Sequence, residues 1–228
     1  MKKSSVKNAF TLPEVLVSIS VIVMVVMAAT SLLVASIRAN VININTIVAY
    51  GLAQEGIEAV RNIRDSDWLL GANFQGQIGK QNISPWGAVL PSASGEVSYY
   101  TVDFRDPLDM PVQNTSQLSS VAPWKLEELG VEKDYGNSAK TRLYKKEYGS
   151  ANELRYTHAK SGEATSFHRY IAVSPVEYSV GAKSVASVFN RAIPKVKKMR
   201  VVSIVEWDEN GNRRQVRLDT ELTDWKND

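Results

Sequence analysis

Two histidines, His158 and His168, have the side chains that most often serve as metal ligands or catalytic bases, and the chain has no cysteine. Neither histidine has a close acidic cluster in the sequence, so a metal site would lack ligands. The sequence also lacks a phosphate-binding glycine loop, a nucleophile elbow and the paired histidines of zinc peptidases. We therefore expect no enzyme activity, no bound metal and no cofactor.

A single carboxylate, Glu14, stands at the edge of a long apolar segment. Residues 15–37 carry no charge, and no basic residue lies within a helical turn of Glu14. A carboxylate at the edge of hydrocarbon costs about 2.5 to 3.5 kcal/mol unless it is paired, and acids in such places are usually functional. The alternative is a helix-terminal acid favoured by the helix dipole at about 0.3 to 1 kcal/mol. The sequence favours a functional acid whose partner comes from elsewhere.

A group of basic residues near the C-terminus could form one positively charged face that binds phosphate groups, such as those of DNA. Aromatic stacking partners are sparse among these residues, and Lys and Arg on edge strands commonly protect a sheet against aggregation. We expect the protective role rather than DNA binding. The residues are Lys195, Lys197, Lys198, Arg200, Arg213, Arg214 and Arg217.

The net charge of +3 comes from the first nine residues. Lys2, Lys3 and Lys7 supply it, and the other 24 of the 27 basic residues balance 24 acidic ones. The basicity of the whole chain therefore says little about its partners. A chain of 228 residues, 44% of them hydrophobic, fits one globular domain with an appended segment.

The uncharged stretch over residues 15–37 has the length that a helix needs to cross a bilayer, about 20 residues. Serine and threonine interrupt it, and small residues of this kind allow helices to pack closely. Lysines precede the stretch and mixed charges follow it, which predicts a cytoplasmic N-terminus. A cleaved secretory signal peptide fits less well, because the apolar run exceeds the usual ~7 to 15 residues and no small-x-small site ends it.

The helical pattern continues beyond the membrane segment, with apolar residues three and four positions apart, and predicts one helix over residues 12–64. Residues 65–95 are rich in Gly, Ser, Asn, Pro and Gln and predict a long irregular connection. Alternating β-branched and aromatic residues then predict strands over 97–104, 169–176 and 199–207. A last hairpin joins 201–207 to 213–218 through Asn210 and Gly211, which tolerate positive φ. Together these elements predict an α+β fold, in which a long N-terminal helix packs on an antiparallel β-sheet.

The residues at the membrane boundary, AFTLPEVLV at positions 9–17, follow a short basic leader and resemble the processing and methylation motif of type IV prepilins and type II secretion pseudopilins. The resemblance implies cleavage between Ala9 and Phe10 and methylation of the new amine. In filaments of this family, that amine meets the glutamate of an adjacent subunit, the role implied here for Glu14. The chain departs from the family in having Ala9 where glycine is usual and Pro13 where an aliphatic residue is usual.

Further segments resemble minor pilins of the V class and related minor pseudopilins. They are LAQEGIEAVRNIRDSDW at 52–68, FHRYIAV at 167–173 and VVSIVEWDENGNRRQVRLDTELTDW at 201–225. This resemblance implies a minor subunit of a type IV pilus or a secretion pseudopilus. Its partners would be other pilins or pseudopilins, a prepilin peptidase and an inner-membrane assembly platform.

The expected parts of the chain are a leader over residues 1–9, a transmembrane and assembly helix over 10–38, an amphipathic outer half of the helix over 39–64 and an extracytoplasmic β-rich domain over 65–228. The precursor would cross the cytoplasmic membrane once with its N-terminus inside. The mature form would lie in a cell-surface filament or a periplasmic pseudopilus. The alternative is an uncleaved, membrane-anchored surface adhesin or receptor.

Overall fold

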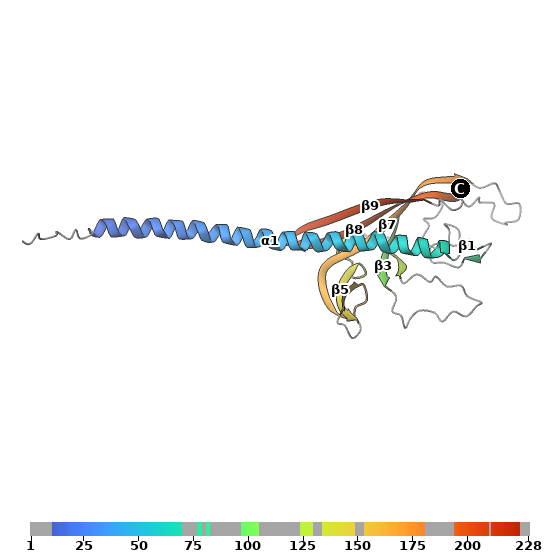
Figure 1. Cartoon of the computed structure of the whole chain (residues 1–228), viewed down its shortest axis with the longest axis horizontal. Helices are drawn as coiled ribbons and strands as arrows, with labels where there is room; N and C mark the ends of the chain where they lie inside the picture. Colours follow the sequence, from blue (N-terminus) through green and yellow to red (C-terminus); the bar gives the residue numbers. More distant parts are fainter. Residues whose placement is uncertain are drawn as a thin grey trace, which may run out of the picture. The chain divides into compact units, whose positions relative to one another are not determined.

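The computed structural model describes residues 11–69, 77–78, 81–82, 97–104, 124–129, 134–148, 153–180, 194–209 and 211–223. A long helix, α1 (Leu12–Leu69), is followed by an antiparallel β-sheet of seven strands (Figure 1). The predicted α+β fold is therefore confirmed. The strands of this sheet are β3 (Ser98–Phe104), β4 (Trp124–Leu129), β5 (Arg142–Tyr148), β6 (Glu153–Thr157), β7 (Glu163–Val180), β8 (Pro194–Glu209) and β9 (Asn212–Thr223).

Helix α1 contains 58 residues and begins where the sequence predicts. Pro13 lies in its first turn, where the missing N–H would have no helical partner in any case. The helix ends five residues beyond the predicted boundary at Arg64. Residues 65–69 continue the helical backbone to Leu69. The chain divides into two compact units, Met1–Asn45 and Thr46–Asp228.

The sheet is organised around β7, its longest strand. One edge of β7 pairs with β8, which pairs in turn with β9. The other edge pairs with β5 near the start of β7 and with β3 further along, from Ile171 to Val173. Strand β4 extends the sheet from β3, and β6 extends it from β5. The sheet therefore divides along this second edge of β7 into two separate strand pairs.

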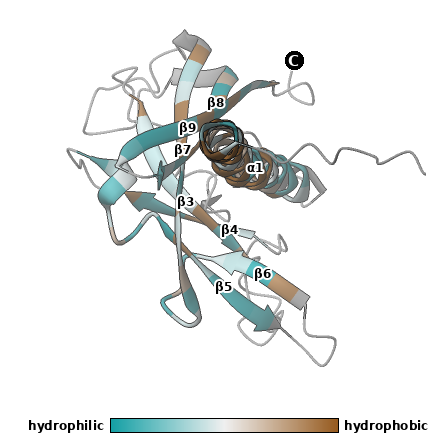
Figure 2. Cartoon of the chain, turned by 90° about the vertical axis from the view of Figure 1, so that its left-hand side faces the viewer, coloured by the Kyte–Doolittle hydropathy of each residue, from teal (hydrophilic) through white to brown (hydrophobic). Residues whose placement is uncertain are grey.

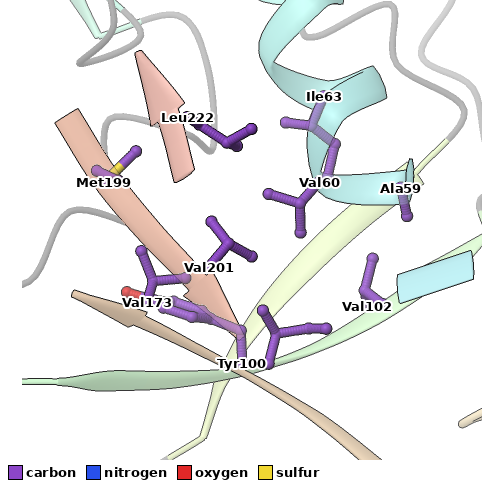
Figure 3. Packing of buried hydrophobic residues seen from close by; sticks show 10 residues of the cluster. Ala59, Val60, Ile63, Tyr100, Val102, Val173, Met199, Val201 and Leu222 are labelled. Atoms are coloured by element: carbon purple, nitrogen blue, oxygen red, sulfur yellow. The ribbon is translucent and has the colours of Figure 1, made fainter. Parts of the chain in front are cut away.

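In the second unit, the helical residues from Thr46 onward pack on one face of this sheet. Every second residue from Phe167 to Val173 of β7 and from Met199 to Trp207 of β8 points to the helix, as the pleat requires. Two hydrophobic clusters form this contact. The first contains Ala59, Val60, Ile63, Tyr100, Val102, Ile171, Val173, Met199, Val201 and Leu222 (Figure 3), and the second contains Ala49, Leu52, Ala53, Leu143, Phe167, Val205, Trp207 and Val216.

Gly56 lies in close contact with the sheet. A Cβ atom at this position would be 2.5 Å from Ser203 Oγ and 3.0 Å from Ile171 Cδ1. Gly51, one turn earlier in the helix, has nothing within 4 Å of the corresponding position. The absence of a side chain is therefore required by packing at Gly56 but not at Gly51.

The opposite face of the sheet is also partly covered. Residues 167–173 of β7 are all buried, so the centre of the sheet has no exposed face. A short 3₁₀ helix, η2 (Tyr135–Asn137), contributes Tyr135, whose ring stacks on Tyr99 at 4.5 Å and lies 5.2 Å from Tyr170. The centre of the sheet is thus covered on both faces.

The long connection predicted over residues 65–95 is only partly tested. Asp65–Leu69 belong to α1, and β1 (Gln77–Ile78) and β2 (Gln81–Asn82) form a small two-stranded sheet. The other residues of this stretch lie outside the described part of the chain. The C-terminal hairpin is confirmed and is tighter than predicted, since β8 ends at Glu209, β9 begins at Asn212 and Gly211 has φ of 79°.

Candidate functional site

The first turn of α1 contains Glu14. The amides of Glu14 and Val15 both donate to the carbonyl of Thr11, at 3.0 and 3.2 Å, which closes this turn. The residue is exposed. Glu14 therefore stands as a solvent-accessible carboxylate at the N-terminal end of an apolar helix. The predicted processing residues Ala9 and Phe10 and the leader lysines Lys2, Lys3 and Lys7 lie outside the described residues.

The following part of α1 is apolar and exposed on all sides. Every residue from 12 to 41 is exposed, and the segment contains valine, leucine, isoleucine and methionine side chains that would bury well in a core. Hydrophobic colouring dominates this part of the helix in Figure 2. Its hydropathy and length are compatible with a single membrane anchor.

Four hydroxyl groups in this segment donate hydrogen bonds within the helix. Ser18, Ser20 and Thr30 each donate to the carbonyl four residues earlier, at 2.8 Å. Ser31 donates to the carbonyl of Ala28, also at 2.8 Å. Because these donors are already bonded, the hydroxyls cost less to bury in lipid or against another helix than unbonded hydroxyls would.

In the second unit, Arg169 links the helix to the sheet. Its side chain is fully buried. Nη1 donates to the carbonyl of Leu52 at 3.3 Å and lies 3.4 Å from a carboxylate oxygen of Glu55, while Nη2 donates to the carbonyl of Val102 at 2.9 Å. The guanidinium thus holds α1 to the point where β3 leaves β7, which is where the sheet divides.

The basic residues predicted to form one face do not all share a face. Arg214 pairs in register with Trp207, on the side that faces the helix, whereas Arg213 and Arg217 alternate to the opposite side. Lys198 and Arg200 also lie opposite the helix, since their neighbours Met199 and Val201 face it. Lys195 and Lys197 belong to β8, but their side chains lie outside the described part.

Carboxylates neutralise four of these basic residues. Lys198 pairs with Glu221, Arg200 with Asp219, Arg213 with Asp134 at 2.8 Å and Arg214 with Glu209 at 3.0 Å. Hydrogen bonds from Arg213 hold the pKa of Asp134 below its usual value, and Arg200 does the same for the pKa of Asp219. The described part of this surface is therefore a mixture of both charges.

The two histidines lie apart from any candidate metal site, since no group of three or more His, Cys, Asp or Glu side chains converges among the described residues. Burial lowers the pKa of His158 to about 3, with Arg169 adding to the effect. Burial also lowers the pKa of His168, whose Nδ1 lies 3.1 Å from the hydroxyl of Thr141. Both rings are therefore neutral at pH 7.

Sequence reasoning missed Arg169 as a structural centre. The available signal was an arginine at a position that alternates with Phe167, Ile171 and Val173 in a strand, on what proves to be the helix-facing side.

No family model matches this chain, and no curated protein or solved structure matches it either.

Proposed function

We propose that this chain is a structural, non-enzymatic subunit, in particular a minor subunit, of a type IV pilus or a type II secretion-like pseudopilus, assembled after a prepilin peptidase removes residues 1–9. The observation that carries the proposal is the N-terminal part of α1. It presents an apolar, uncharged surface on all sides, with Glu14 as the acid at its start. Such a surface needs lipid before assembly and other helices after it.

The role proposed for Glu14 follows from charge pairing. Cleavage between Ala9 and Phe10 creates an α-ammonium about one helical turn before Glu14. Both charges then lie beside an apolar surface, where each costs free energy unless it meets an opposite charge. A neighbouring subunit offset along the helix axis supplies that charge, so the pair forms only between subunits that are assembled.

The rest of the chain fits the same role. The β-rich unit, Thr46–Asp228, has its own core and packs its helical residues on the sheet. The fully buried helical residues of this core lie from Ala49 onward. Other pilins, the prepilin peptidase and the assembly platform in the inner membrane are the partners that the proposal requires.

The variant Glu14→Gln tests the proposal. Membrane insertion and cleavage should be nearly unchanged, because an amide is cheaper to place in lipid than a charge and the cut lies outside the changed side chain. Incorporation into filaments should fall at least tenfold, because removing one member of a desolvated pair typically costs about 3 to 5 kcal/mol. The measurement is the ratio of sheared filament protein to membrane-retained protein.

Glu58→Gln is the matched control. Glu58 is an exposed acid on the part of α1 that packs on the sheet, where it pairs with Arg61 at 2.7 Å. Its replacement should leave the ratio unchanged, since exposed pairs of this kind contribute less than about 1 kcal/mol. An unchanged ratio for a correctly processed Glu14→Gln protein would mean that Glu14 is not an assembly contact. A native protein that retains Met1 would favour the alternative, an uncleaved surface adhesin or receptor.

A further inference from the structure

A pocket opens at the place where the sheet divides. It has a volume of about 270 Å³ and lies between the ends of β3 and β4 on one side and β6 on the other, with Glu55 of α1 also in its wall. Figure 2 shows β4 and β6 next to each other, and residues of both strands line this pocket. The hydrophobic part of the lining comes from Phe104, Trp124, Leu154 and Tyr156.

Asp103 places a carboxylate in this wall that lacks a cationic partner among the described residues. The residue is 8% exposed. Its oxygens accept hydrogen bonds from the hydroxyl of Thr157 at 2.8 Å and from the amides of Phe104 and His158 at 3.0 and 3.3 Å. These donors supply hydrogen bonds to the carboxylate but bring no positive charge. A buried charge is costly until an opposite charge compensates it.

Glu55 adds a second carboxylate to the pocket. Its side chain is 34% exposed, and it lies 3.4 Å from the buried guanidinium of Arg169. Glu55 lines the pocket, whereas Arg169 does not. The two acids reach the same cavity from different elements, the helix and β3.

The aromatic wall is also suited to a cation. Phe104 and Trp124 meet edge to face at 5.4 Å, and the guanidinium of Arg155 already lies over the ring of Phe104 at 4.7 Å. Aromatic faces attract ammonium and guanidinium groups and bury the aliphatic stems that carry them. Arg155 contributes one positive charge at this ring, so selectivity for a further cation depends on Asp103 and Glu55.

We propose that this pocket binds one lysine or arginine side chain from an extended segment of a partner polypeptide. The stem lies against Trp124, Leu154 and Tyr156, and the charged head reaches Asp103 and Glu55. The cavity is slightly smaller than the roughly 300 to 1,000 Å³ of typical small-molecule sites, which suits one long side chain. Among the strands that the structure describes, β6 pairs with β5 alone, so an extended segment can lie beside its other edge.

The test uses the full chain in detergent micelles, labelled with 5-fluorotryptophan. The ¹⁹F signal of Trp124 is assigned by its loss in Trp124→Phe. The probes are the peptides acetyl-Val-Lys-Val-amide and acetyl-Val-norleucine-Val-amide, which differ only in the charged head, and n-butylammonium. The lysine peptide should shift the Trp124 signal saturably, with an affinity at least tenfold higher than that of either other probe.

Variants identify the carboxylates. Asp103→Asn should weaken the binding of the lysine peptide at least tenfold and leave the binding of the norleucine peptide unchanged. Glu127 is an exposed residue of β4 that does not line this pocket, so Glu127→Gln should change the binding of neither peptide. Should Asp103→Asn fail to fold, Glu55→Gln provides the same test with at least a threefold loss. The proposal is overturned if the lysine and norleucine peptides bind equally, if n-butylammonium binds as tightly as the lysine peptide, or if no probe moves the signal.

Discussion

The two parts of α1 bury their apolar side chains in different ways. Before residue 42 every described residue is exposed, although the segment is almost entirely apolar. From Ala49 to Ile63 the aliphatic side chains are buried against the sheet, and Tyr50 and polar residues such as Glu58 and Asn62 take the exposed positions. One face of the second part is therefore committed to its own fold, while the whole surface of the first part remains available for lipid or for other chains.

The comparison predicts that single substitutions will destabilise the β-rich unit only when they fall on the second part of the helix or on the strands that pack against it. Arg169→Met should have the largest effect, lowering the free energy of unfolding by about 3 kcal/mol. The change leaves the carbonyls of Leu52 and Val102 without this donor and Glu55 without its partner. Urea unfolding of the full chain in micelles, followed by near-ultraviolet circular dichroism, measures it.

Arg61→Met is the control for Arg169→Met. Arg61 belongs to the same part of the helix but is 39% exposed. It pairs with Glu58 at the surface, and its Nη2 donates to the hydroxyl of Thr220 at 3.0 Å. Its replacement should cost less than about 1 kcal/mol. Equal losses for the two variants would mean that the buried guanidinium does not join helix and sheet in the way described.

Two glycines of the second part of the helix allow the same comparison with a change of one methyl group. Gly56→Ala should destabilise the β-rich unit by about 2 kcal/mol, because the new Cβ would overlap Ser203 Oγ. Gly51→Ala meets no atom within 4 Å and should stabilise the unit by up to about 1 kcal/mol, since alanine favours the helix. Thermal unfolding of both variants gives the sign, and a loss of stability at Gly51 equal to that at Gly56 would contradict the assigned helix face.

Acid should also act on the β-rich unit alone. The folded pKa of His158 is about 3, below the usual 6.5, so the unfolded chain takes up more protons as the pH falls through 6.5 and stability is lost. At pH 5.5 the loss is about 1 kcal/mol relative to pH 7. Unfolding at both pH values should show a smaller difference in His158→Gln. His168, whose pKa is also lowered, accounts for the pH dependence that remains in this variant. If the stability difference between the two pH values is the same in His158→Gln as in the unchanged protein, His158 is not its cause.

Deleting residues 1–39 should have the smallest effect of all. The compact unit begins at Thr46, and the helical residues that form its clusters or pack against them begin at Val48. The shortened protein should be soluble without detergent and should unfold cooperatively, with a free energy within about 1 kcal/mol of the full chain. A shortened protein without a cooperative transition would show that the first part of the helix contributes to folding after all.

Strong periodic patterns allowed much of the fold to be predicted. The start of α1, the strand β3 and the core of β8 follow from runs of apolar or β-branched residues whose spacing admits one kind of element. The end of α1 was missed because Asp65 and Ser66 have low helix propensity, and the structure continues the helix through them. Local sequence cannot decide such a boundary.

The contacts of Arg169 were not predictable, because its hydrogen-bond acceptors are backbone carbonyls 117 and 67 residues away. Backbone atoms leave no signal in a single sequence. The basic residues show a related limit, since the side of the sheet taken by Arg213 or Arg214 depends on the exact register of the hairpin, and one residue exchanges the faces. The acid Glu14, by contrast, stands out in the sequence because nothing around it is charged.

The central claim, that the chain is a processed filament subunit, is tested most directly by the N-terminus of the native protein in sheared surface filaments or pseudopili. Intact-mass and N-terminal peptide analysis of that fraction should find a chain that begins at a methylated Phe10, with the membrane fraction holding the remaining precursor and unassembled subunit. A native protein that begins at Met1, retains Lys2 to Ala9 and stays entirely with the membrane would contradict the account.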